Sequence, residues 1–160
     1  MELPKATATV SPLQQSRAGR EQQRYDGKTR LLACVAIVDA SAPERRVLLI
    51  SSSKRPDEWI LPKGGWESDE TIEECALREA EEEAGVQGSV IRDLGELDFV
   101  NTKGSAHRLY GFVLQCIHQY DHWAEQSRRR EWVSFDEALV RLEQRPELCA
   151  ILTRAKSALT

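Results

Sequence analysis

The sequence has few of the residues that mark extracellular or membrane-spanning chains. It contains four cysteines and one methionine in 160 residues, and no two cysteines form a C-x-x-C pair. This usage favours reduced thiols in the cytosol and disfavours both a disulfide framework and a zinc site. The longest apolar run near the amino end, residues 31–38, is too short to span a bilayer and too far along the chain for a signal peptide. No membrane partner is therefore expected.

Neither sign of charge dominates. The chain has 26 acidic and 22 basic side chains, a formal net charge of -4, which excludes a uniformly basic coat for nucleic acid. Its length suits one buried core and is short for two domains. We expect a disordered basic arm over residues 1–16, with a transit peptide as the alternative, and a single domain over residues 17–160.

The apolar pattern predicts several strands around one central helix. A turn is predicted at residues 62–65, where Pro62 is followed by Lys63, Gly64 and Gly65. The loop joining the first two strands is expected at residues 39–44. The predicted strands cover residues 31–38, 47–50, 89–99, 108–117 and 131–133.

Capping residues predict where the helices begin and end. Thr71 with Glu74 forms a capping box, and Gly85 is suited to end a helix over residues 71–84. Ser134 with Glu137 predicts a second capping box, and Pro146 ends that helix and starts the next. Strands, a central helix and carboxyl-terminal helices together predict a mixed α/β layered domain.

The central helix is strongly acidic. Residues 67–83 hold nine acidic side chains and one basic one, Arg78, so this segment carries -8 and the other residues carry 21 - 17 = +4. At about 100° per residue, Glu79, Glu82 and Glu83 share one helical face, where like charges repel. A solvated face is the ordinary reading of such a triplet. Clustered carboxylates also suit hard divalent cations such as Mg²⁺ and Mn²⁺.

The surroundings of this triplet favour the metal site. The chain reads Gly64-x5-Glu70-x7-Arg78-Glu79-Ala80-x-Glu82-Glu83-x-Gly85-Val86, which resembles the signature of the Nudix hydrolases at every specified position. Ordinary residue frequencies make a chance match of the charged and glycine positions rarer than roughly one in ten thousand.

This resemblance implies an α/β fold in which a mixed β-sheet is sandwiched between α-helices. It also implies hydrolysis of a diphosphate linked to another group, with Mg²⁺ as the cofactor and Mn²⁺ as a substitute. By position in the signature, Glu79 and Glu83 would be direct metal ligands, and Glu82 would be a ligand or the base that activates water. The choice of base stays open.

The remaining signature residues would support these carboxylates. Arg78 would hold Glu70 or Glu82, and the carbonyl oxygen of Lys63 or Gly64 would complete the metal shell. Phosphoryl transfer depends mostly on positioning and on neutralising the charge of the phosphate oxygens, which suits such a site.

Further stretches resemble the diphosphoinositol polyphosphate phosphohydrolases, particularly their fungal-type members. These stretches are residues 19–25, 30–33, 47–53, 59–65, 107–110 and 128–132. The resemblance implies a small-molecule substrate, either a diphosphoinositol polyphosphate or a diadenosine polyphosphate. Alternatives are an mRNA cap, with capped RNA as a partner, inorganic polyphosphate, another nucleoside diphosphate-linked substrate, and a module that binds phosphorylated metabolites without hydrolysing them.

By the same resemblance, a set of polar and basic residues would contact substrate phosphates through charge-assisted hydrogen bonds. They are Arg24, Lys28, Arg30, Ser52, Ser53, Lys54, His107, Arg128 and Arg145. Taken singly, Arg128 also suits a solvated strand start, Arg145 a helix end and His107 an ordinary surface position. The loop 101–106 offers only Lys103. The indole of Trp66 or Trp123 could stack an adenine or pack in the fold.

No obligate protein partner is indicated, because the sequence has no heptad or exposed apolar stripe. We expect a cytoplasmic location, with the nucleus as a second one.

Overall fold

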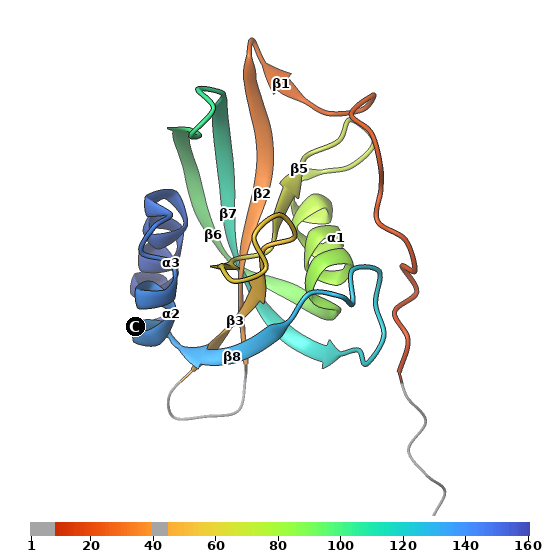
Figure 1. The fold of residues 1–160 in the computed structure, drawn as a ribbon, viewed down its shortest axis with the longest axis vertical. Coiled ribbons are helices and arrows are strands. Elements are labelled where there is room, and N and C mark those ends of the chain that lie inside the picture. Colours follow the sequence, from red (N-terminus) through yellow and green to blue (C-terminus); the bar gives the residue numbers. More distant parts are fainter. Residues whose placement is uncertain (1–8, 40–44) are drawn as a thin grey trace, which may run out of the picture.

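A mixed β-sheet lies between helices in the computed structural model, which describes residues 9–39 and 45–160 (Figure 1). The strands are β1 (Tyr25–Asp26), β2 (Thr29–Val38), β3 (Arg46–Ser51), β4 (Trp59–Ile60), β5 (Lys63–Gly65), β6 (Val86–Val100), β7 (Ala106–Gln119) and β8 (Arg130–Ser134). The helices are α1 (Ile72–Ala84), α2 (Phe135–Arg141) and α3 (Pro146–Ala158).

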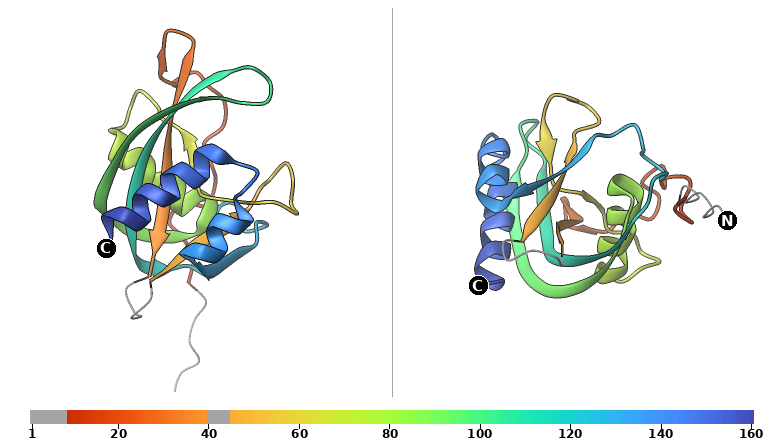
Figure 2. Two further views of the ribbon diagram at one scale, coloured as in Figure 1. Left: turned by 90° about the vertical axis from the view of Figure 1, so that its left-hand side faces the viewer. Right: turned by 90° about the horizontal axis from the view of Figure 1, so that it is seen from below.

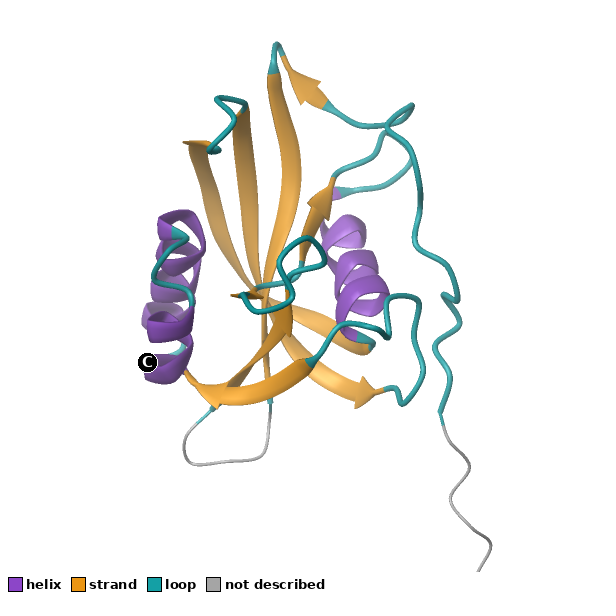
Figure 3. Ribbon diagram, in the orientation of Figure 1, coloured by secondary structure: helices purple, strands orange, loops and turns teal. Residues whose placement is uncertain are grey.

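The sheet is organised around β2, in which eight of ten residues are buried. Its main path runs β4-β3-β2-β7-β6, while β1 and β5 also pair with β2 and β8 pairs with β3. The β2–β7 pair is parallel, with Arg30 opposite His107, whereas the β6–β7 pair is antiparallel. Helix α1 covers one side of the sheet, and α2 with α3 covers the other (Figures 2 and 3). The predicted sandwich of a mixed sheet between helices is therefore confirmed.

Helix α1 packs closely because its inner stripe is small. Ala76, Ala80 and Ala84 are fully buried, and short side chains let the helix backbone approach the sheet. On the opposite side, α3 buries its own stripe of larger apolar residues. These are Leu148, Ile151, Leu152 and Ala155. The described part of the chain contains no helix long and apolar enough to cross a membrane.

Most predicted elements are present, with two differences. The turn predicted at residues 62–65 is wrong for its second half, because Lys63–Gly65 forms β5 and pairs with residues 32–34 of β2. Only half of the second capping box forms: Ser134 Oγ accepts from Glu137 N, but the Glu137 carboxylate accepts instead from Arg141 Nε at 2.9 Å. That charge-assisted contact lies one helical turn away. The predicted loop at residues 39–44 falls mainly outside the described residues.

The segment before the sheet also differs from expectation. Residues 1–8 lie outside the described part of the chain, but Thr9–Ser16 contact the loop that follows β7. Val10 forms a bridge with His122, and the backbone amide of Ser11 donates to the carbonyl of His122 at 2.8 Å. Backbone pairing gives this polar stretch the order that its composition alone does not predict.

Candidate functional site

The acidic face of α1 is fixed by well-defined helix ends. Thr71 accepts from the backbone amide of Glu74, whose carboxylate accepts in return from the amide of Thr71, so the predicted capping box is complete. Gly85 ends the helix in the left-handed conformation with φ 64°, which an L side chain adopts at a cost. These two caps fix the bounds of the helix, and the buried alanine stripe against the sheet sets its rotation about its axis.

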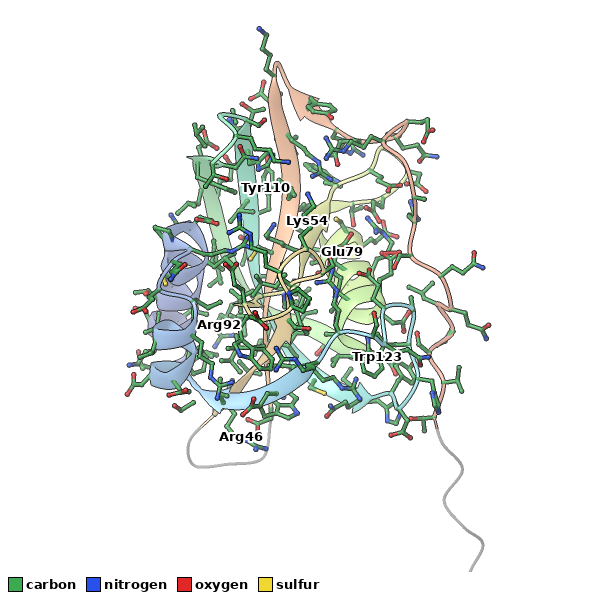
Figure 4. All side chains as sticks on the ribbon, viewed as in Figure 1. Arg46, Lys54, Glu79, Arg92, Tyr110 and Trp123 are labelled. Atoms are coloured by element: carbon green, nitrogen blue, oxygen red, sulfur yellow. The ribbon has the colours of Figure 1, made fainter. Side chains whose placement is uncertain are left out.

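That rotation turns three carboxylates inward. Glu79, Glu82 and Glu83 are only 6%, 3% and 7% exposed, so the triplet is a buried cluster and not a solvated face. Figure 4 labels Glu79 on α1. Buried carboxylates are costly unless they are paired or hydrogen-bonded. The partners of these three groups therefore define the site.

Strand β5 supplies the first partner. The backbone amide of Lys63 donates to Glu83 Oε1 at 3.0 Å. At Gly64 the missing side chain is essential, because a Cβ placed there would lie 2.2 Å from the Glu79 carboxyl group. The strand can pass directly over Glu79 only because residue 64 is glycine. The metal contact expected of the Lys63 or Gly64 carbonyl oxygen stays a prediction.

Arg78 is the main cation of the cluster. Its Nη2 lies 2.7 Å from Glu70 Oε1, and its Nη1 lies 2.8 Å from Glu79 Oε1 and 2.9 Å from Glu82 Oε2. The expected contact of Arg78 with Glu70 or Glu82 is thus made with both residues. Nη2 also donates to the carbonyl of Gly65 at 3.0 Å, which ties the helix to β5.

The carboxylates outnumber their cations. Burial is the main cause that raises the pKa of Glu79 to about 7, and burial together with the nearby Glu79 charge raises the pKa of Glu83. Burial also raises the pKa of Glu82, although the amide of Arg17 and the Arg78 guanidinium oppose it. For Glu70, burial raises the pKa, but the hydrogen bonds from Arg78 and from the Glu67 amide, together with the Arg78 charge, outweigh burial and lower the pKa. The helix face thus retains uncompensated negative charge.

The donor set fits a hard divalent cation. Among the described residues, no hydrogen-bond donor reaches Oε2 of Glu79 or Oε2 of Glu83, whereas both oxygens of Glu82 accept hydrogen bonds. In the described ranges, no group of three or more Cys, His, Asp or Glu side chains is arranged to hold a metal ion. The carboxylates of the cluster instead accept hydrogen bonds from Arg78 and from backbone amides. Buried oxygen donors with excess negative charge are nevertheless the chemistry that Mg²⁺ and Mn²⁺ require.

The loop after β7 closes the carboxyl end of α1. The amide of Glu125 donates to the carbonyl of Glu82 at 3.0 Å, and the Trp123 indole donates to the carbonyl of Glu83 at 3.1 Å. Arg128 Nη2 lies 2.8 Å from Glu125 and 3.6 Å from Glu83 Oε2. The role of Glu125 is not predictable from the sequence, because no motif links it to α1.

Part of the predicted phosphate-binding set gathers over β2. Arg30 on β2 lies opposite His107 on β7, and Lys63 on β5 lies opposite Cys34 on β2. The charges of Arg30, Lys63 and Arg20 help burial lower the pKa of His107. Arg20 was not among the predicted contacts, although it lies in one of the matching stretches. Arg30 borders Gly65, since a Cβ there would lie 2.9 Å from Arg30 Nη2.

A second part of the predicted phosphate-binding set lies around the loop of residues 52–58. Ser52 is buried and its Oγ accepts from the amide of Arg55 at 3.3 Å, whereas Ser53 and Lys54 are exposed. Arg145 reaches the same loop by donating to Glu58 Oε2 at 3.2 Å. Ser51, which also lies in a matching stretch, accepts through its hydroxyl from the amide of Arg129 at 2.8 Å.

Two of the predicted contacts, Arg24 and Arg128, have other partners within the fold, and a third, Lys28, is exposed and stays a prediction. Arg24 donates to the carbonyls of Glu67, Ser68 and Glu70, so it braces the loop before α1. Arg128 is buried among carboxylates and does not face solvent. Lys28 is exposed at the turn between β1 and β2. Positional matching cannot separate an arginine that binds phosphate from one that satisfies backbone carbonyls, because the same donors serve both.

The tryptophans are covered by arginines. The guanidinium carbon of Arg24 lies 4.5 Å from the Trp66 ring centre, and that of Arg130 lies 3.9 Å from the Trp123 ring centre. Both indoles also donate hydrogen bonds to backbone carbonyls. Trp66 and Trp123 thus follow the packing alternative, and each has one face occupied.

Comparison with known proteins gives a consistent result. Residues 30–152 match the model of the NUDIX domain. The chain is 38% identical over 131 residues to "Nudix hydrolase 18, mitochondrial" of Arabidopsis thaliana, covering 77% of this chain and 74% of the relative. It is also 38% identical over 124 residues to "Diphosphoinositol polyphosphate phosphohydrolase 3-alpha" of Mus musculus, covering 74% of this chain and 73% of the relative.

Solved structures share the fold at lower identity. An Ap4A hydrolase of C. elegans superposes with a TM-score of 0.67 and 21% identity, over 81% of this chain and 96% of that one. A NUDIX hydrolase from Nitrosomonas europaea gives a TM-score of 0.71 with 18% identity, over 82% of this chain and 90% of that one.

Proposed function

The chain belongs to the Nudix hydrolase family, and from this membership we propose that it is a Mg²⁺-dependent enzyme acting on diphosphoinositol polyphosphates and diadenosine polyphosphates. Nudix hydrolases of this kind cleave phosphoanhydride bonds and generally use divalent metals. The observation that carries the proposal is the buried cluster of Glu79, Glu82 and Glu83 beside the basic residues of β2, β5 and β7.

The oxygens left without donors suggest how the roles divide. Glu79 and Glu83 would hold Mg²⁺, or Mn²⁺ in its place, because no hydrogen-bond donor of the described residues reaches Oε2 of either side chain, although Arg128 Nη2 lies 3.6 Å from Glu83 Oε2. The bound ion would neutralise charge on the phosphate oxygens. Glu82, fixed by a donor on each oxygen, is assigned as the base: it would take a proton from water as the water oxygen attacks phosphorus and the leaving phosphate departs.

The basic residues favour a substrate with many phosphates. Arg30, Lys63 and His107 gather at the edge of the carboxylate cluster, where they can meet phosphate oxygens that the acidic helix alone would repel. Ser53 and Lys54 offer further exposed donors. Recognition of an adenine ring by stacking is less favoured, since an arginine covers one face of Trp66 and another covers one face of Trp123. The 38% identity to the mouse diphosphoinositol polyphosphate phosphohydrolase supports the same choice.

A substrate panel tests this proposal. Purified protein would be assayed with Mg²⁺ on a diphosphoinositol polyphosphate, a diadenosine polyphosphate, a capped RNA and inorganic polyphosphate, and kcat/KM compared. We expect the highest value for the diphosphoinositol polyphosphate, with turnover of the diadenosine polyphosphate. Preference for capped RNA or inorganic polyphosphate would reassign the substrate. Binding without turnover of any of the four would replace the enzyme with a binding module.

A further inference from the structure

A strap formed by residues 9–17 runs alongside α1, as the red segment of Figure 1 shows. Thr9 bonds to the Asp121 carboxylate through its backbone amide at 2.9 Å. Ser16 Oγ donates to Glu125 Oε2 at 2.6 Å, and the amide of Glu125 itself donates to the carbonyl of Glu82. The strap and the end of α1 are thus held by the same loop.

The strap ends on the carboxylate cluster. The backbone amide of Arg17 donates to Glu82 Oε1 at 2.9 Å, while Arg78 Nη1 donates to Oε2 at 2.9 Å. Glu82 is 3% exposed, so water cannot readily replace a missing donor. The Arg17 side chain anchors the amide from the other side, with Nη1 2.7 Å from Glu67 and 2.8 Å from Asp69.

We propose that the Arg17 backbone amide is a positioning group for hydrolysis, which fixes the plane of the Glu82 carboxylate so that it can accept the proton of the attacking water. This rests on the role proposed above for Glu82. With Arg17 N–H removed, Arg78 is the one hydrogen-bond donor left to the Glu82 carboxylate among the described residues, and Arg78 also pairs with Glu70 and Glu79. The carboxylate could then rotate about its terminal bond.

The proposed donor lies outside the part of the chain that defines the family. The NUDIX model matches residues 30–152, whereas the strap precedes residue 18. Because the strap supplies a hydrogen bond to Glu82 from outside this domain, activity should depend on whether the strap is bound to the loop after β7. Two mutations at the docking contacts, Asp121→Ala and Ser16→Ala, should therefore lower kcat in proportion to how far they free the Arg17 amide.

Proline substitution removes the amide directly. Arg17→Pro deletes the N–H group, and hydrogen bonds to charged groups are strong enough that kcat should fall about tenfold, with KM within about twofold of wild type. Gln15→Pro is the matched control, since the Gln15 amide makes no hydrogen bond among the described residues. It should retain wild-type kcat. An equal loss in both variants would place the effect in the strap as a whole and overturn the proposal.

An ester bond offers a test without a proline ring. Chemical ligation at Cys34 allows residues 1–33 to be made with an ester oxygen in place of the Arg17 amide nitrogen, and the same ligation with the natural amide is its control. The ester should reproduce the fall in kcat. In parallel, the Arg17 amide should exchange slowly with deuterium in wild type and at least about tenfold faster in Glu82→Ala, because the acceptor is lost. Rapid exchange in wild type, or an ester protein with unchanged kcat, would overturn the proposal.

Glu82→Gln separates this proposal from the one on which it rests. If Glu82→Gln keeps full activity, the role of Glu82 fails whatever Arg17 does. If Glu82→Gln is inactive while Arg17→Pro matches Gln15→Pro, only the positioning role of Arg17 fails.

Discussion

Arg78 Nη1 lies 2.9 Å from Glu82 Oε2, one helical turn along α1, and both side chains are less than one-tenth exposed. Because the same guanidinium also reaches Glu70 and Glu79, it is the shared partner of three buried carboxylates. The ion pairs of this residue are therefore unlike those at the surface of the protein.

Arg78→Ala should be strongly destabilising. Removing one partner of a buried ion pair leaves uncompensated charge and costs about 3–5 kcal/mol in the free energy of unfolding. Urea unfolding at neutral pH measures this. The control is Arg141→Ala, whose exposed pairs with Glu131 and Glu137 contribute about 1 kcal/mol or less. Equal losses in the two variants would contradict the account of Arg78.

Gly64→Ala should remove activity more than stability. A Cβ at this position would lie 2.2 Å from the Glu79 carboxyl group, so Glu79 must move and kcat should fall about 100-fold. Gly104→Ala is the comparison: nothing lies within 4 Å of its Cβ position, and its φ of 82° confines the effect to backbone strain of about 1–2 kcal/mol. If the kcat of Gly64→Ala equals that of Gly104→Ala, catalysis does not depend on the observed position of the Glu79 carboxylate.

The stability of the metal-free protein should fall as pH rises from about 5 to 8. Burial raises the pKa of Glu79 to about 7 and also raises that of Glu83, so the folded state binds protons more tightly than the unfolded state in this range. The stabilising protons are lost as pH passes the folded-state pKa. Thermal unfolding in EDTA across this range measures the effect.

Divalent metal should reverse this trend. Mg²⁺ or Mn²⁺ competes with protons for the carboxylates, so the metal-induced rise in unfolding temperature should grow with pH. Ca²⁺-free buffers with matched ionic strength are the control. A metal effect independent of pH, or absent at pH 8, would speak against a site at Glu79 and Glu83.

Arg30→Ala and His107→Ala should weaken substrate binding. Each would remove a proposed hydrogen bond to a charged phosphate group, so KM for the diphosphoinositol polyphosphate should rise about tenfold while kcat changes by less than about twofold. Lys103→Ala, in the exposed loop after β6, is the control for a general loss of positive charge. A fall in kcat without a change in KM would instead place Arg30 or His107 at the reacting atoms.

The sequence predicts α1 and its acidic face well because local rules define them. Thr71, Glu74 and Gly85 set the helix ends, and a spacing of about 100° per residue places Glu79, Glu82 and Glu83 together. The same rules fail for β5, since glycine and lysine have low strand propensity and the strand exists through its pairing with residues 32–34 of β2, which lie far from it in the sequence.

Contacts between distant segments were not predictable in the same way. The Arg17 amide reaches Glu82, and Glu125 reaches the end of α1, through backbone groups that every residue possesses. Arg24 matched a phosphate contact by position but binds backbone carbonyls. Side-chain chemistry fixes what a residue can bind, whereas the fold decides which partner is within reach.

The most direct test compares phosphate release from a diphosphoinositol polyphosphate by wild type, Glu83→Gln and Glu81→Gln, each with Mg²⁺ and with EDTA. Glu81 lies on the same helix outside the carboxylate cluster. The account predicts Mg²⁺-dependent turnover by wild type and Glu81→Gln, and a loss of about 100-fold or more in Glu83→Gln. Turnover in EDTA, or full activity of Glu83→Gln, would contradict it.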